Sequence, residues 1–168
     1  MAAIDEKYLF PRYVRSGGVF VPIINKVLAL HDFEGGQTMS FSDRNRIIAD
    51  EVQQAVDKEK KLAKAEGRES KTSAVRAKML AKHDKWVVPT IAEWRVIMVF
   101  MGEINKCLAR NGGTPLGRGW YHTSSNKNFS FAEQPWMVNL YSGYMGPVKE
   151  LHDTASFRLI SKTTIHEK

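Results

Sequence analysis

One segment of the sequence predicts a helix whose two ends are both defined. Thr90 and Glu93 follow Pro89 at the three-residue spacing of a capping box, in which each side chain accepts a hydrogen bond from the other residue's backbone amide. Asn111-Gly112-Gly113 supplies the left-handed residue that ends many helices, and Pro115 comes soon after it. Between these ends an apolar stripe recurs at helical spacing: Trp94, Ile97, Met98, Met101, Ile104 and Leu108. We therefore expect one helix with one buried face.

Short strands are expected on both sides of this helix. Two segments rich in β-branched and aromatic residues, 19–24 and 27–30, follow a pair of glycines, and Pro22 favours an edge or a bend. A turn is expected at 32–37. Three later segments alternate large apolar with polar residues: 120–123, 136–141 and 157–160. The order of strands, helices and strands predicts an α+β domain rather than repeated βαβ units.

A charged segment, residues 44–85, lies between the first strands and the well-defined helix. It holds 12 Lys+Arg against 7 Asp+Glu, which accounts for 5 of the 7 net positive charges of the chain. Ser42 is the expected N-cap of a helix that Gly67 interrupts, and Thr72 or Ser73 is expected to cap a shorter one. The apolar face of the first of these helices comprises Ile47, Ile48, Val52, Ala55, Val56, Leu62 and Ala63. We expect a helical insertion within a single domain, 1–168.

The composition excludes several classes of protein. One cysteine among 168 residues permits no intrachain disulfide and no cysteine-rich zinc site. The longest mostly apolar run, 94–101, is far shorter than the roughly 20 residues that cross a bilayer, so we expect no membrane insertion. The first residues lack the apolar stretch and cleavage site of a secretory signal. The histidines, at 31, 83, 122, 152 and 166, have no spacing that places two on one helical face, so no metal site is expected.

Two pairs of titratable residues are candidate catalytic groups, and each has a structural alternative. Cys107 with His122 or His83 could provide a nucleophile and a base. Free cysteines are more often small, inert core residues, and Cys107 lies beside the apolar stripe. His31 and Asp32 could form an acid–base pair, but adjacent strand residues point to opposite faces. We therefore expect Asp32 to cap the turn.

Five motifs occur in an order that is familiar from one superfamily. They are VPTIAEW at 88–94, GGTPL at 112–116, GWYHTSS at 119–125, WMVN at 136–139 and FRLIS at 157–161. Together they resemble the C-type-lectin-like superfamily, most closely the branch of gut-bacterial surface proteins, phage tail or fibre proteins and retroelement-diversified variable proteins, which is related to the sulfatase-modifying-factor fold. The resemblance covers about residues 86–161, and 30–40 look like the family's loop before its first helix. It implies N-terminal strands, two to three helices with the charged insertion, and C-terminal antiparallel strands.

Departures from the family pattern argue against calcium binding and catalysis. Calcium-dependent sugar binding in the family pairs a proline-flanked carboxylate or amide with a second acidic group, since a hard cation needs several oxygen ligands. Glu133-Gln134-Pro135-Trp136 has no acidic residue after the proline. The relatives that modify sulfatases use paired cysteines, whereas Cys107 is alone. We expect a non-enzymatic protein without cofactor or metal.

The resemblance also implies an exposed recognition face on the C-terminal loops. We assign the three motif tryptophans, Trp94, Trp120 and Trp136, to the core. The residues expected on the exposed face are Tyr121, Asn126, Lys127, Asn128, Phe129, Tyr141 and Tyr144. Tyrosine and asparagine suit recognition because they combine rigid contact area with adaptable hydrogen bonds. An ordinary polar loop is the alternative, and the sequence leaves both open.

Basic residues of the charged segment provide a second candidate surface. They are Lys58, Lys60, Lys61, Lys64, Arg68 and Lys71. Lysine and arginine dominate the affinity of proteins for nucleic acid, because they neutralise phosphates. Acidic residues interleave with them, which favours a solvated, ion-paired helix face. Docking on a neighbouring subunit is a third possibility.

These observations lead to two functional hypotheses. The first is a structural or recognition protein of a phage virion, in a fibre, tail or head decoration, made in the host cytoplasm without a signal peptide. It would form a homo-oligomer and contact other virion proteins. Loops 121–130 and 141–150 would contact a host surface glycan or another virion protein. The alternative is a small intracellular protein that binds nucleic acid through the basic helices of 44–85.

Overall fold

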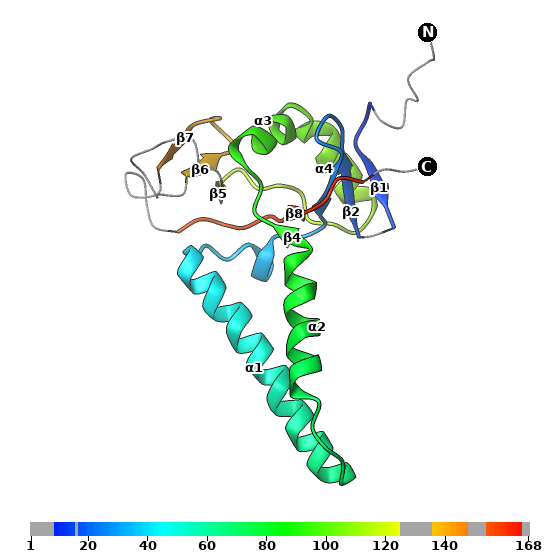
Figure 1. Cartoon of the computed structure of the whole chain (residues 1–168). Helices are drawn as coiled ribbons and strands as arrows, with labels where there is room; N and C mark the ends of the chain where they lie inside the picture. Colours follow the sequence, from blue (N-terminus) through cyan, green and yellow to red (C-terminus); the bar gives the residue numbers. More distant parts are fainter. Residues whose placement is uncertain (1–8, 16, 125–135, 148–153, 166–168) are drawn as a thin grey trace. The chain divides into compact units, whose positions relative to one another are not determined.

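The structure is a computed structural model that describes residues 9–15, 17–124, 136–147 and 154–165. The chain forms two compact units, which Figure 1 shows in sequence colours. The first unit comprises Met1–Met39 with Val87–Lys168, and the second comprises Ser40–Trp86. The structure contains helices and two antiparallel sheets, so the predicted α+β class is confirmed. No helix in the described ranges is long and apolar enough to cross a membrane.

The larger sheet has five strands in the order β1-β2-β3-β8-β4. Their bounds are β1 Arg12–Val14, β2 Gly18–Val21, β3 Lys26–Ala29, β8 Ile160–Ser161 and β4 Trp86–Val87. Val19 pairs with Leu28, and Leu28 pairs with Ile160 on the other side, so three buried residues cross the middle of the sheet. The two predicted N-terminal strands are confirmed, and Pro22 lies in the turn after β2. The predicted strand at 157–160 begins only at Ile160.

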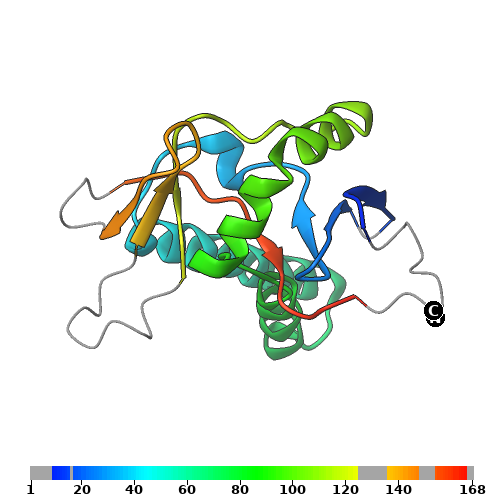
Figure 2. The ribbon, with the colours of Figure 1, turned by 90° about the horizontal axis from the view of Figure 1, so that it is seen from above.

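The smaller sheet has three strands in the order β5-β6-β7. They are β5 Trp120–His122, β6 Trp136–Asn139 and β7 Met145–Pro147. Tyr121 pairs with Val138, which pairs in turn with Met145. Strands were predicted at 120–123 and 136–141, and both are confirmed, although β6 ends at Asn139. Figure 2 shows β6 and β7 at the opposite side of the first unit from β1.

The predicted helix of the first unit is two helices, α3 (Ile91–Val99) and α4 (Met101–Arg110). The capping box is confirmed, because the Glu93 amide lies 3.1 Å from Thr90 Oγ1 and the Thr90 amide lies 3.0 Å from Glu93 Oε1. The prediction of one continuous helix is wrong, since Phe100 leaves the helical region at φ −97° and ψ 8°. The apolar stripe stays buried on both sides of this bend: Trp94, Ile97, Ile104 and Leu108. The structure therefore has four α-helices in its described part, one more than the resemblance implied.

Helix α4 packs against β1 and β2, and helix α3 packs against β6. Trp94 on α3 joins the helix to the smaller sheet, because its indole nitrogen donates to the His122 carbonyl at 3.1 Å and its ring lies 5.2 Å from Tyr121. The assignment of Trp94 to the core is confirmed. Trp120 and Trp136 are only partly buried, so their full assignment to the core is wrong.

The second unit is a helical hairpin of α1 (Phe41–Glu66) and α2 (Thr72–Asp84). Its first N-cap is Ser40 rather than Ser42: Ser40 has an acidic residue, Asp43, three positions later, and the two form a capping box. Gly67 ends α1, as predicted, and it adopts the left-handed conformation. Val52, Val56 and Ala63 are the buried residues of α1.

The start of α2 differs from the prediction that Thr72 or Ser73 caps it. Lys71 holds the N-cap position, and its own side chain makes no capping hydrogen bond. A carboxylate from the other helix serves instead, since the Lys71 amide donates to Glu59 Oε1 at 3.1 Å. Capping motifs are defined by residues within a few positions of the helix start. A carboxylate twelve residues away therefore could not be predicted from them.

Candidate functional site

The turn between β6 and β7 presents two tyrosines on a hydrogen-bonded frame. Asn139 Oδ1 accepts from the amides of Tyr141 at 3.0 Å and Ser142 at 2.9 Å. The Asn139 backbone carbonyl accepts from Gly143 at 2.8 Å, and its amide donates to the Tyr144 carbonyl at 2.8 Å. Gly143 adopts φ +77°, a conformation that favours glycine. These hydrogen bonds therefore fix the backbone of the turn that carries the two tyrosines.

These tyrosines are exposed and have an aromatic and a cationic neighbour. Tyr141 is 75% exposed and Tyr144 is 54% exposed. The Trp120 ring meets Tyr144 edge-on at 6.1 Å, and the Arg118 guanidinium carbon lies 5.8 Å from the centre of the Tyr141 ring. We call these four residues the aromatic face. Both tyrosines were expected on an exposed surface, whereas Trp120 was expected in the core and Arg118 was not expected at the site.

The backbone around Arg118 is fixed by hydrogen bonds of its two sequence neighbours, Gly117 and Gly119. The Gly117 amide donates to the Tyr121 hydroxyl at 3.0 Å, and the Gly119 carbonyl accepts from the Leu140 amide at 3.1 Å. The Arg118 side chain is exposed and makes no ion pair within the described ranges. Its backbone is thus anchored while its guanidinium remains available to a ligand.

A buried polar network lies behind this loop. Arg158 is 0% exposed, and its Nε donates to Asp32 Oδ1 at 2.7 Å. Its two terminal nitrogens donate to the carbonyls of Ala29, at 2.8 Å, and Thr114. The Tyr121 hydroxyl donates to Asp32 at 2.9 Å. We call Asp32, Tyr121 and Arg158 the Arg158 network. It satisfies a buried charge pair with several hydrogen bonds, as such a pair requires.

The structure corrects the placement of Tyr121. It was expected on the exposed face, but its side chain is 2% exposed and its hydroxyl belongs to the Arg158 network. Burial and the nearby Asp32 carboxylate raise the pKa of Tyr121 to about 12. The alternation of a strand explains the error, because Trp120 and Tyr121 must face opposite sides of β5. The sequence could have assigned either of them to the exposed side.

The expected roles of His31 and Asp32 also change. At the predicted turn the structure has a short segment, Phe33–Gly36 (η2), in which Glu34 and Gly35 have positive φ, and Asp32 makes no side-chain capping bond to it. The Asp32 carboxylate binds Arg158 and Tyr121 instead. His31 Nδ1 lies 2.8 Å from Thr114 Oγ1. The two neighbours therefore serve different partners.

The candidate nucleophile and bases are engaged separately. Cys107 is partly buried, and burial raises the pKa of its thiol. His122 Nε2 lies 2.6 Å from the Met39 carbonyl, and its ring stacks on Phe157 at 4.3 Å. His83 Nε2 lies 3.0 Å from a Glu51 carboxylate oxygen. Within the part of the chain that the structure describes, no group of three or more histidine, cysteine or acidic residues could hold a metal ion.

Several residues of the predicted recognition loops lie outside the described residues. They are Asn126, Lys127, Asn128 and Phe129, and the same applies to Glu133, Gln134 and Pro135 of the proline motif. Loop 121–130 is therefore described only as far as residue 124, and loop 141–150 only as far as 147.

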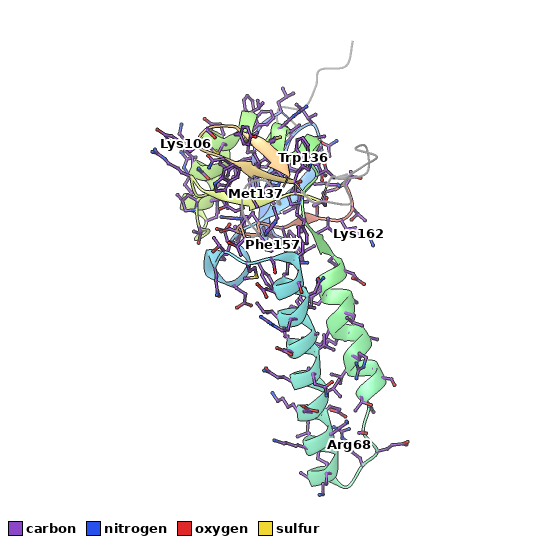
Figure 3. All side chains as sticks on the ribbon, turned by 90° about the vertical axis from the view of Figure 1, so that its left-hand side faces the viewer. Arg68, Lys106, Trp136, Met137, Phe157 and Lys162 are labelled. Carbon is purple, nitrogen blue, oxygen red and sulfur yellow. The ribbon has the colours of Figure 1, made fainter. Side chains whose placement is uncertain are left out.

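The basic surface of the second unit divides into two kinds of residue. Five lysines are exposed and make no side-chain ion pair in the described ranges: Lys58, Lys60, Lys61, Lys64 and Lys71. Arg68 instead lies at the connection of the two helices, where it binds Glu59 and Glu66 at 2.6 Å each (Figure 3). The hydrogen bonds from Arg68 and from the Lys71 amide lower the pKa of Glu59 to about 2. The expected ion pairing is thus confined to Arg68 among these six residues.

A scan of protein-family models and searches of curated proteins and of solved structures each found no match.

The chemistry of the aromatic face follows from its side chains. Its rings offer flat apolar area, its tyrosines add hydroxyls, and Arg118 adds a cation on an anchored loop. This set of groups suits the binding of a ligand that has both apolar and hydrogen-bonding surfaces.

Proposed function

We propose that the protein is a non-enzymatic recognition module that binds a host surface glycan through the aromatic face. The observation that carries this proposal is the pair of exposed tyrosines on a hydrogen-bonded turn, beside Trp120 and Arg118. Large exposed aromatic groups that cluster on a rigid element are typical of binding sites. A sugar ring offers apolar C–H faces for stacking on tyrosine and hydroxyls for hydrogen bonds.

The resemblance of five ordered motifs supports a C-type-lectin-like fold and a place in a phage particle. The observed order of strands, helices and strands is compatible with that fold. In this proposal the protein is made in the host cytoplasm and joins a fibre, tail or head decoration as a homo-oligomer that contacts other virion proteins. The turn at Asn139–Tyr144 then reaches the host surface.

Glycan binding is tested with an array of host surface oligosaccharides, followed by titration calorimetry of the sugars that bind. We expect Tyr141→Ala and Tyr144→Ala each to weaken binding by about fivefold or more, because the stacking of a ring on one aromatic side chain contributes on the order of 1–3 kcal/mol, as measured for nucleic-acid bases. Tyr13→Ala is the matched control, since Tyr13 is also exposed but lies on β1. Binding should not depend on calcium. Failure to bind any sugar, or equal losses in all three variants, contradicts the proposal.

The place in the virion needs a separate experiment. Mass spectrometry of purified particles and cryo-electron microscopy should find the protein at a fixed copy number, and light scattering should find a defined oligomer. A stable monomer that is absent from particles would refute the virion part of the proposal and leave glycan binding to be judged alone.

The unpaired lysines of α1 favour nucleic-acid binding as a second candidate function. Lys58, Lys61 and Lys64 are exposed and hold no ion pair within the described ranges. Binding to DNA should weaken with salt, and changing all three lysines to glutamine should reduce the slope of log K against log salt by about 0.9 for each lost phosphate contact. Lys162→Gln is the control, because Lys162 is exposed in the first unit. An unchanged slope in the triple variant would exclude this surface.

A further inference from the structure

We infer that the glycan bound by the aromatic face carries an oxyanion, a carboxylate or a phosphate on the sugar, and that Arg118 binds it. This inference rests on the proposed glycan binding and names the class of sugar. It starts from the placement of a guanidinium beside an exposed aromatic ring, with the Arg118 carbon 5.8 Å from the centre of Tyr141. A sugar stacked on Tyr141 would bring its substituents next to this cation.

Among the residues that the structure describes, Arg118 has no acidic partner to neutralise its charge. Behind its loop lies the Asp32 carboxylate, but the Arg158 guanidinium neutralises it at 2.7 Å. The turn that carries the tyrosines adds only neutral polar groups, from Asn139 and Ser142. Arg118 itself has no acidic partner in the described ranges. An anionic ligand therefore meets a positive charge that no carboxylate of the described residues offsets.

The form of the cation also selects the ligand. A guanidinium offers five N–H donors in a planar fork that matches the oxygens of a carboxylate or a phosphate, and hydrogen bonds of this kind are about twice as strong as neutral ones. The loop around Arg118 is fixed by the hydrogen bonds of Gly117 and Gly119. Anchoring the backbone reduces the entropy that is lost when the side chain binds.

The test compares three oligosaccharides of equal length by titration calorimetry: one neutral, one with a uronic acid and one with a sugar phosphate. We expect at least one anionic sugar to bind about tenfold more tightly than the neutral one, because hydrogen bonds to charged groups contribute more than neutral ones. Arg118→Gln should lower the ratio of the anionic to the neutral affinity to about one, whether or not the neutral affinity also falls. Arg118→Lys should retain part of the preference, and higher salt should reduce it.

Each outcome bears on a different statement. A preference for the uronic acid or for the phosphate supports the inference and identifies the source of the oxyanion. Equal binding of all three sugars, with no effect of Arg118→Gln, refutes the inference while the proposed glycan binding stands. No binding of any sugar, on the array or in calorimetry, refutes the proposed function itself. Because Arg118 is exposed, thermal melting should show all variants folded like the wild type.

Discussion

Replacing Arg158 with methionine tests whether the Arg158 network holds the first unit together. The side chain is fully buried and supplies hydrogen bonds to the Asp32 carboxylate and to the carbonyls of Ala29 and Thr114. Methionine fills most of the volume but donates to none of them. Asp32 would remain as a largely buried carboxylate without its cation, and breaking a buried pair in this way costs about 3–5 kcal/mol.

Urea unfolding followed by tryptophan fluorescence measures this cost, and thermal melting gives a second value. A protein of this size loses roughly 2–4 °C in Tm for each kcal/mol, so the expected decrease is ~6–20 °C. Arg95→Met is the matched control, because Arg95 is exposed on α3, and it should change the free energy of unfolding by less than about 0.5 kcal/mol.

A double-mutant cycle separates the lost pair from lost packing. Asp32→Asn with Arg158→Met removes both charges, so the double variant should be less destabilised than the sum of the two single variants, by about 1–3 kcal/mol. Additive losses, or a loss below about 1 kcal/mol for Arg158→Met, would refute the idea that a desolvated charge pair stabilises this unit.

Three further predictions concern the buried tyrosine, the hairpin connection and two glycines. Ultraviolet titration should show one tyrosine ionising near the pKa of about 12 that burial gives Tyr121. Because this pKa is raised from 10.0, the free energy of unfolding should fall between pH 10 and 12, and Tyr121→Phe should abolish both effects; a titration that the variant leaves unchanged would contradict the assignment. NMR should find the pKa of Glu59 at about 2, lowered from 4.5, so its stabilising effect is present above pH 4.5 and lost as the pH falls toward 2. Arg68→Gln should return this pKa toward 4.5, and a value that stays near 2 would disprove the role of Arg68. Gly102→Ala, inside α4, should stabilise the protein by about 0.5–1 kcal/mol, whereas Gly112→Ala, at φ +75°, should destabilise it by about 1 kcal/mol, and equal signs would contradict the conformational argument, since a new Cβ has no neighbour within 4 Å at either site.

Local signals in the sequence predicted the parts of the fold that depend on neighbouring residues. The Thr90–Glu93 box and the Gly67 terminus were both expected, because each is formed by residues within a few positions of one another. The true first cap, Ser40, obeys the same rule as the expected Ser42 but satisfies it with Asp43. The bend at Phe100 was not expected, since an apolar stripe has the same spacing in a straight helix and in a bent one.

Contacts between distant residues could not be predicted in this way. Arg158 and Asp32 are 126 positions apart, and Tyr121 and Asp32 are 89 apart. Each of these three residues has several possible partners in the sequence, and its actual partner follows only from the fold. The same limit applies to the candidate site. Tyr141 and Tyr144 were expected there from the family resemblance, whereas Arg118 was identified only from its position beside Tyr141 in the structure.

Strand β5 links the buried network to the aromatic face through two adjacent residues. Trp120 faces outward and contacts Tyr144, while Tyr121 faces inward and binds Asp32. The Tyr121 hydroxyl also accepts from the Gly117 amide, so the residue before Arg118 is fastened to the same network that Arg158 anchors. Since a surface loop fixed by buried hydrogen bonds loses less entropy on binding, the buried charges would strengthen the proposed glycan binding without touching the ligand. Through the Tyr121 hydroxyl the Arg158 network therefore supports the backbone of the loop that carries Arg118.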